Sequence, residues 1–140
     1  MNQNKNRVFI VIDDDRINNM ICTKMIGMSF PESDIQTFLL PEEGLNYLQT
    51  YNQVEDKPNA ILFLDINMPV LSGWDILKKM EDFPETRKNS IDTYMLSSSV
   101  GHLDLEKADN HPLVKGYISK PLTKAKLFSY FASSTVEEVK

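Results

Sequence analysis

Acidic side chains stand directly after an apolar run at two places in this sequence. Residues 9–12 pass straight into the three carboxylates of 13–15, and the apolar run 60–64 ends on Asp65. Carboxylates that lie close together repel one another, and a divalent cation between them removes the repulsion. Carboxylate oxygens are the ligands that Mg²⁺ selects in proteins. The acids therefore predict a magnesium site, to which Asp13, Asp14 and Asp65 contribute.

The same residues carry the groups that phosphoryl transfer needs. An aspartate such as Asp65 can accept a phosphoryl group as an acyl phosphate. Ser97 and Lys120 follow two other apolar runs, and a hydroxyl and an ammonium are suitable donors for phosphoryl oxygens. Mg²⁺ usually binds only one or two carboxylates and keeps room for a phosphate oxygen. This combination favours a phosphoryl-transfer site over a closed structural metal site.

These residues are positioned by strands and helices that alternate along the chain. The expected strands are 7–12, 34–38, 60–64, 93–96 and 115–118. The expected helices follow them, at about 17–28, 41–50, 74–80, 103–108 and 123–131. Strict alternation predicts an α/β fold, a doubly wound five-stranded parallel sheet with helices on both faces. The carboxyl ends of parallel strands meet at one edge, so we expect the acids, Ser97 and Lys120 to meet there.

The first helix begins next to the acids. The side chain of Asp15 suits the N-cap position of this helix, which separates it in role from Asp13 and Asp14. Apolar side chains then recur at helical spacing, namely Ile17, Met20, Ile21, Met25 and Met28. Cys22 lies among them, so we expect a small core residue and not a reactive thiol.

Composition limits the classes of function. The 140 residues are 41% hydrophobic and 25% charged, which suits one domain, 1–140, with a core of about 7–131. The net charge of −5 argues against a nucleic-acid partner. A single cysteine cannot form an internal disulfide, which favours a reducing compartment. The polar start, with no long apolar segment after it, predicts no membrane association and a cytoplasmic location.

Four segments taken together resemble a known family. The segments IDDD, LDINMPVLSG, MLSSS and GYISKP occur in the order and at the spacing of the receiver domain of response regulators in two-component signalling. The resemblance covers about 7–131 and is to single-domain, chemotaxis-regulator-like receivers. It implies the (βα)5 flavodoxin-like fold and a signalling phosphoprotein. Such a protein is not an enzyme beyond catalysing its own phosphorylation and dephosphorylation.

The resemblance also implies a role for each site residue. Asp65 is the expected phosphoacceptor, and Mg²⁺, with Mn²⁺ as an alternative, is the expected metal. Asp14 is the expected direct ligand with Asp65, Asp13 acts through water, and Asn67 offers its backbone carbonyl. Two further residues act on the phosphoryl group, Ser97 through its hydroxyl and Lys120 through its ammonium, on a bond to Pro121 that is expected to be cis. Together with Ser97, Tyr117 is the expected conformational switch.

The expected phosphoryl donor is a sensor histidine kinase or a histidine phosphotransfer protein. A downstream protein is expected to bind the surface formed by the last two strands and helices. Two alternatives stay open. A metal-dependent phosphohydrolase with an Asp nucleophile usually has a second Asp two residues later, where this chain has Asn67, which cannot transfer a proton in that way. The other is a receiver-like interaction domain that is not phosphorylated. The chain is either a stand-alone receiver or part of a longer protein.

Overall fold

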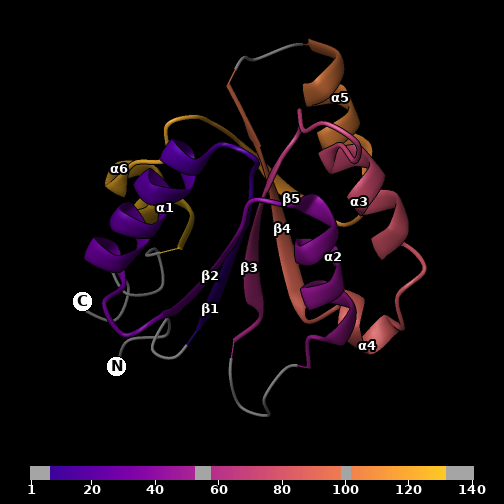
Figure 1. Ribbon diagram of the computed structural model, residues 1–140, viewed down its shortest axis with the longest axis horizontal. Helices are drawn as coiled ribbons and strands as arrows, with labels where there is room; N and C mark the ends of the chain where they lie inside the picture. The colour runs from indigo at the N-terminus through magenta and orange to yellow at the C-terminus, as the bar shows by residue number, and fades with distance from the viewer. Residues whose placement is uncertain (1–6, 53–57, 99–101, 132–140) are drawn as a thin grey trace.

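The described residues of the protein, 7–52, 58–98 and 102–131 of a computed structural model, contain five strands and six helices. The strands are β1 (Val8–Ile12), β2 (Asp34–Phe38), β3 (Ala60–Asp65), β4 (Ile91–Ser97) and β5 (Val114–Ser119). They form one parallel sheet in the order β2-β1-β3-β4-β5 (Figure 1). The predicted five-stranded parallel sheet is therefore confirmed.

The strand sequences fit their places in the sheet. All six residues of β3 are buried, because a central parallel strand is covered on both faces. The outer strand β2 is half polar and only partly buried. Within the sheet, Ile12 pairs with Leu64, and Asp65 pairs with Leu96. This register brings the carboxyl ends of the central strands to one edge.

Helices cover both faces of the sheet (Figure 1). On one face α1 (Arg16–Ser29) and α6 (Lys124–Phe131) pack over the aromatic core around Phe9 and Phe63. On the other face lie α2 (Pro41–Thr50), α3 (Gly73–Met80) and α5 (His102–Asn110). The side chains of this second layer pack on an aliphatic core that includes Leu62 and Leu64. No helix in the described ranges is long and apolar enough to span a membrane.

One helix was not predicted. The single turn α4 (Glu85–Lys88) lies between α3 and β4, begins after Pro84, and contains no buried residue. A four-residue polar helix has no hydrophobic periodicity, so the sequence pattern does not reveal it.

The apolar residues at helical spacing do not mark the buried face of α1. Its buried residues are Asn18, Asn19, Cys22 and Ile26, whereas Ile17 and Met20 are 68% and 65% exposed. The physical reason is polar, because both asparagines bond to Asp13 at the end of β1 and turn that face toward the sheet. Cys22 is a core residue as predicted, and burial, with Asp13 nearby, raises the pKa of its thiol to about 12.

Candidate functional site

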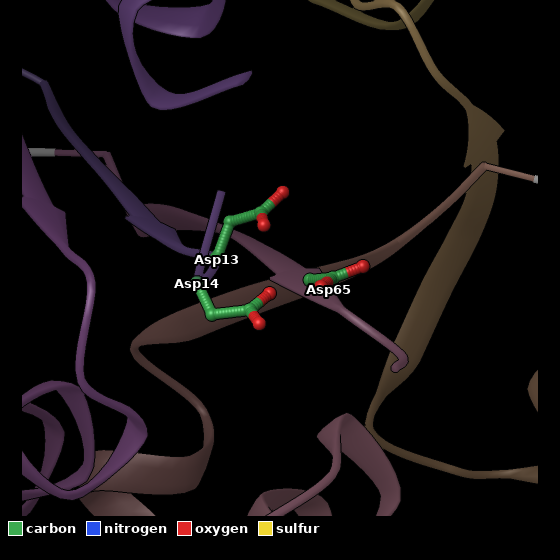
Figure 2. A group of neighbouring side chains, drawn as sticks. All are labelled: Asp13, Asp14 and Asp65. Carbon is green, nitrogen blue, oxygen red and sulfur yellow. The ribbon is translucent and has the colours of Figure 1, made fainter. Parts of the chain in front are cut away.

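Three carboxylates lie together at the carboxyl edge of the sheet. Asp13 and Asp14 follow β1, and Asp65 is the last residue of β3. One oxygen of each carboxylate lies within 4.8 Å of the others, and Figure 2 shows the three side chains side by side. The strand order thus brings together acids that are more than fifty residues apart in the sequence.

Three hydrogen-bond donors hold the carboxylate of Asp13. Its side chain is fully buried, and Oδ2 accepts bonds from Asn18 Nδ2 at 2.6 Å and Lys120 Nζ at 2.7 Å. Its Oδ1 accepts the backbone N–H of Asp15 at 2.9 Å. Burying a carboxylate is costly unless hydrogen bonds and an opposite charge compensate it, and Asp13 has both.

The next two acids have different surroundings. Asp14 is exposed, so its carboxylate is open to solvent beside the two buried acids. The side chain of Asp15 accepts the backbone N–H groups of Ile17 at 2.9 Å and Asn18 at 3.3 Å. Asp15 is therefore the N-cap of α1, as its residue type predicted.

Lys120 joins the two buried acids. Its ammonium lies 2.7 Å from Asp13 Oδ2 and 3.0 Å from Asp65 Oδ1. Its backbone N–H donates to the carbonyl of Ser97 at 2.7 Å, and its bond to Pro121 is cis, as expected. Burial alone would lower the pKa of this ammonium, but the bonds to both carboxylates outweigh burial and raise the pKa.

The surroundings of Asp65 disfavour its charged form. Burial, followed by the neighbouring charge of Asp13, raises the pKa of this carboxyl from 3.8 to about 6, although the bond from Lys120 acts in the opposite direction. A group with such a pKa, held at the edge of a sheet beside two other acids, is typical of a functional site. A cation bound here would restore its charged form.

The remaining predicted site residues lie around this cluster. Ser97 is the last residue of β4 and is 1% exposed, and Ser97 pairs with Ser119 in the sheet. Asn67 is exposed in the loop after β3. Tyr117 lies on β5, partly buried, and packs against the core under α2, α3 and α5. Asp13, Asp65 and Lys120 are thus in direct contact, whereas Tyr117 belongs to the neighbouring core.

Two residues between β3 and the first turn of α3 have backbone constraints that the sequence pattern did not indicate, Val70 in the loop and Gly73 as the first residue of α3. A Cβ on Gly73 would lie 2.4 Å from the carbonyl oxygen of Asp65, so only glycine fits there. Val70 has a φ of 70°, and the N–H of Leu71 donates to the carbonyl of Pro69 at 2.8 Å. These features describe a tight γ-turn at a β-branched residue. Asn18 was also missed, although two asparagines in an apolar helix next to three acids are a usable signal.

The residues of this cluster fit a magnesium ion. The donors are carboxylate oxygens from two buried residues and one exposed residue, the hard oxygen set that Mg²⁺ prefers. The described residues offer no cysteine or histidine within this group of ligand atoms, which disfavours zinc.

Comparison with known proteins agrees with this arrangement. A sequence model of the response regulator receiver domain matches residues 9–132. A crystal structure of a two-component response regulator from Cytophaga hutchinsonii is 30% identical, with a TM-score of 0.80 over 95% of this chain and 98% of that one. A response regulator receiver protein from Dyadobacter fermentans is 25% identical, with a TM-score of 0.75 over 89% and 98% of the two chains.

A curated relative, stress response regulator protein 1 of Scheffersomyces stipitis, is 29% identical over 76 residues, which are 54% of this chain. The matched part is only 24% of that relative, so this chain corresponds to about a quarter of its length.

Proposed function

The chain belongs to the response regulator receiver domain family, and on that premise we propose that Asp65 accepts a phosphoryl group from a phosphohistidine. The donor is a sensor histidine kinase or a histidine phosphotransfer protein. The chain acts as one receiver unit with a core of about 7–131, in the cytoplasm, where its buried free Cys22 stays reduced. It is a signalling phosphoacceptor that catalyses only its own phosphorylation and dephosphorylation.

The observation that carries this proposal is the bridge from Lys120 to both buried acids. One ammonium lies 3.0 Å from Asp65 Oδ1 and 2.7 Å from Asp13 Oδ2, at the edge where a ligand can approach. An ammonium in this place can follow the negative charge as it moves from the carboxylate to the phosphoryl oxygens. A carboxylate that served only as a helix cap would not require such a partner.

The acids supply the ligands for Mg²⁺. The exposed Asp14 and the end of β3, Asp65, would bind the ion directly, and the backbone carbonyl of Asn67 would complete the protein's share. Asp13 would act through water, because both of its oxygens already accept bonds from the chain. When bound, Mg²⁺ neutralises the carboxylates and the phosphoryl oxygens and thereby lowers the electrostatic cost of bringing them together.

In the transfer itself, an oxygen of Asp65 attacks the phosphorus of phosphohistidine. A P–O bond forms, the P–N bond breaks, and the leaving imidazole keeps the electron pair and takes a proton from solvent. Ser97 donates its hydroxyl to a phosphoryl oxygen, and Lys120 pairs with another. Water later hydrolyses the acyl phosphate and restores the carboxylate.

The phosphoryl group then changes the surface formed by the last two strands and helices. Ser97 lies on β4 and Tyr117 on β5, the two strands that belong to this surface. Movement of their side chains would shift the equilibrium between two conformations of the surface. The only tryptophan ties α5 to α3, since Trp74 Nε1 donates to Asp104 at 3.3 Å and the Lys107 ammonium lies 5.4 Å from its ring. A downstream protein would bind the state in which this surface is rearranged.

The decisive experiment is to incubate the protein with Mg²⁺ and acetyl phosphate and measure its intact mass. We expect one phosphoryl adduct that hydroxylamine removes and that Asp65→Asn lacks. Asp82→Asn, an exposed acid of another loop, is the matched control and should keep the adduct. No adduct from acetyl phosphate or from a phosphohistidine donor would favour the interaction domain. Rapid multiple turnover of other phosphoesters would favour the phosphohydrolase.

The switch is tested separately, by hydrogen exchange with and without the phosphoryl group. We expect altered exchange in α5 and β5 and unchanged exchange in α2, which lies beside β2 at the far edge of the sheet. Unchanged exchange in α5 and β5 would contradict the proposed output surface.

A further inference from the structure

The outer strand β5 leaves backbone carbonyls that no neighbouring strand can pair. In a parallel strand, the backbone groups of successive residues point alternately to one side and the other, and among the strands of the described residues β5 has a neighbour only on the β4 side. The N–H of Lys120 points to β4, where it bonds to Ser97. The carbonyls of Tyr117 and Ser119 therefore point outward. Exposed groups of this kind need other donors.

Helix α6 supplies these donors from one face. Tyr130 Oη lies 3.4 Å from the carbonyl oxygen of Tyr117, and Lys126 Nζ lies 2.7 Å from that of Ser119. Lys126 and Tyr130 are four residues apart in α6, so their side chains share a side of the helix.

The ammonium of Lys126 contacts two further acceptors besides the carbonyl of Ser119. Its Nζ also lies 3.3 Å from the hydroxyl of Ser119 and 3.0 Å from the carbonyl of Pro121. A lysine ammonium has three N–H donors, and three acceptors surround this one. Because Ser119 and Pro121 flank Lys120, the ammonium holds the backbone on both sides of the lysine that contacts the acids.

The position of Lys126 in α6 makes this choice of residue informative. Thr123 accepts the backbone N–H of Lys126 at 3.2 Å, so Lys126 is the third residue after the cap. Glu or Gln usually occupies that place, where its side chain bonds back to the cap. A cation in the first turn is also opposed by the helix dipole. Helix stability alone therefore does not favour lysine here, whereas the bonds to the β5–α6 loop do.

We propose that Lys126 is a positioning residue for phosphoryl transfer, because it fixes the backbone from which Lys120 reaches Asp13 and Asp65. The proposal rests on the proposed function, in which Lys120 pairs with the phosphoryl group. Lys126 itself touches neither acid, and its donors are already used by the loop. It acts through Lys120, whose long flexible side chain lies at the right place only if its backbone does.

The test compares Lys126→Met with Lys124→Met in the full chain. Methionine keeps the unbranched stem and suits a helix, so α6 should persist in both variants. Lys124 is exposed in the same turn and is the matched control. Three quantities are measured: amide hydrogen exchange of Lys120 by NMR, the rate of adduct formation with acetyl phosphate, and the Mg²⁺ affinity by calorimetry.

We expect Lys126→Met to speed exchange of the Lys120 amide and to slow adduct formation, each by about tenfold, as for the loss of a charged hydrogen bond. Mg²⁺ affinity should stay the same or increase, because the acids are intact and a competing ammonium is less well placed. A general loss of structure would instead weaken Mg²⁺ binding too. In a Lys120→Met background, Lys126→Met should cause no further loss of rate.

The outcomes separate the two proposals. If the unmutated protein forms no adduct, the proposed function fails, and the exchange measurement still decides whether Lys126 holds the loop. Unchanged exchange at Lys120 would overturn the inference. Faster exchange with an unchanged rate of adduct formation, or an additive loss in the double variant, would overturn the positioning role.

Discussion

The side-chain amide of Asn18 donates to Oδ2 of Asp13 at 2.6 Å, inside the interface between α1 and the sheet. This oxygen also accepts the ammonium of Lys120. Asn18 therefore helps to hold a buried carboxylate that also contacts Lys120. The bond joins the packing of α1 to the geometry of the acids, and it explains why a polar residue occupies the buried face of this helix.

We predict that Asn18→Ala lowers the free energy of unfolding by about 2 kcal/mol, since a bond to a charged group is lost and the carboxylate stays buried. Asn46→Ala, at an exposed position of α2, should change it by less than about 0.5 kcal/mol. Urea unfolding at neutral pH without Mg²⁺ measures both. Equal effects of the two substitutions would show that the Asn18–Asp13 bond does not stabilise the fold.

Much of the site could be predicted because it depends on topology alone. The apolar runs of β1 and β3 are unambiguous, and the end-of-strand rule places Asp13, Asp65 and Lys120 at one edge whatever the detailed packing. Asp14 and Ser97 were expected at this edge by the same rule, whereas Asn67 and Tyr117 were named only through the family resemblance.

The face of α1 could not be predicted from hydropathy. Ile17 and Met20 are more apolar than Asn18 and Asn19, yet the asparagines are buried because Asp13 requires donors. The spacing of apolar residues does not report a polar partner such as Asp13. The role of Lys126 was hidden for a related reason, since its acceptors are backbone carbonyls that no side-chain pattern reports.

The pKa of Asp65 predicts a pH-dependent difference between the protein and Asp65→Asn. Burial and Asp13 raise this pKa from 3.8 to about 6, so the folded state binds the proton more tightly than the unfolded state. The protonated Asp65 therefore contributes favourably to the free energy of unfolding below pH 4, and this contribution is lost as the pH rises through about 6. Above pH 7 without Mg²⁺, we expect Asp65→Asn to be more stable than the protein by about 2 kcal/mol.

Thermal or urea unfolding from pH 4 to pH 8 measures this difference. Comparing the two proteins at each pH cancels the acids that lie far from Asp65, because these titrate alike in both proteins. The difference in the free energy of unfolding between the two proteins should vanish toward pH 4. Added Mg²⁺ at pH 8 should reduce this difference, because it stabilises the unmutated protein more. A difference that does not vary with pH would contradict the raised pKa.

Gly73 and Gly27 should respond in opposite ways to alanine. A Cβ at Gly73 would lie 2.4 Å from the Asp65 carbonyl oxygen, which is backbone and cannot move aside cheaply. We expect Gly73→Ala to lower the free energy of unfolding by about 2 to 3 kcal/mol and to slow adduct formation by shifting the end of β3. Gly27 has open space around it within α1, so Gly27→Ala should raise the stability by up to about 1 kcal/mol. Urea unfolding measures the stability of both variants, and stabilisation by Gly73→Ala would show that the start of α3 and the end of β3 move apart at little cost.

At position 70, a glycine variant should be more stable than an alanine variant, which is the reverse of the usual order. The φ of 70° at Val70 is a backbone conformation that any side chain with a Cβ disfavours, and its side chain is 85% exposed, so little packing is lost on truncation. At an ordinary position glycine is less stable than alanine by about 0.5 to 1 kcal/mol. Here we expect Val70→Gly to be more stable than Val70→Ala, by about 1 kcal/mol, because relief of the strained φ exceeds the entropy cost of glycine. Urea unfolding of the two variants measures the order. If alanine is the more stable, the turn at Val70 stores no strain.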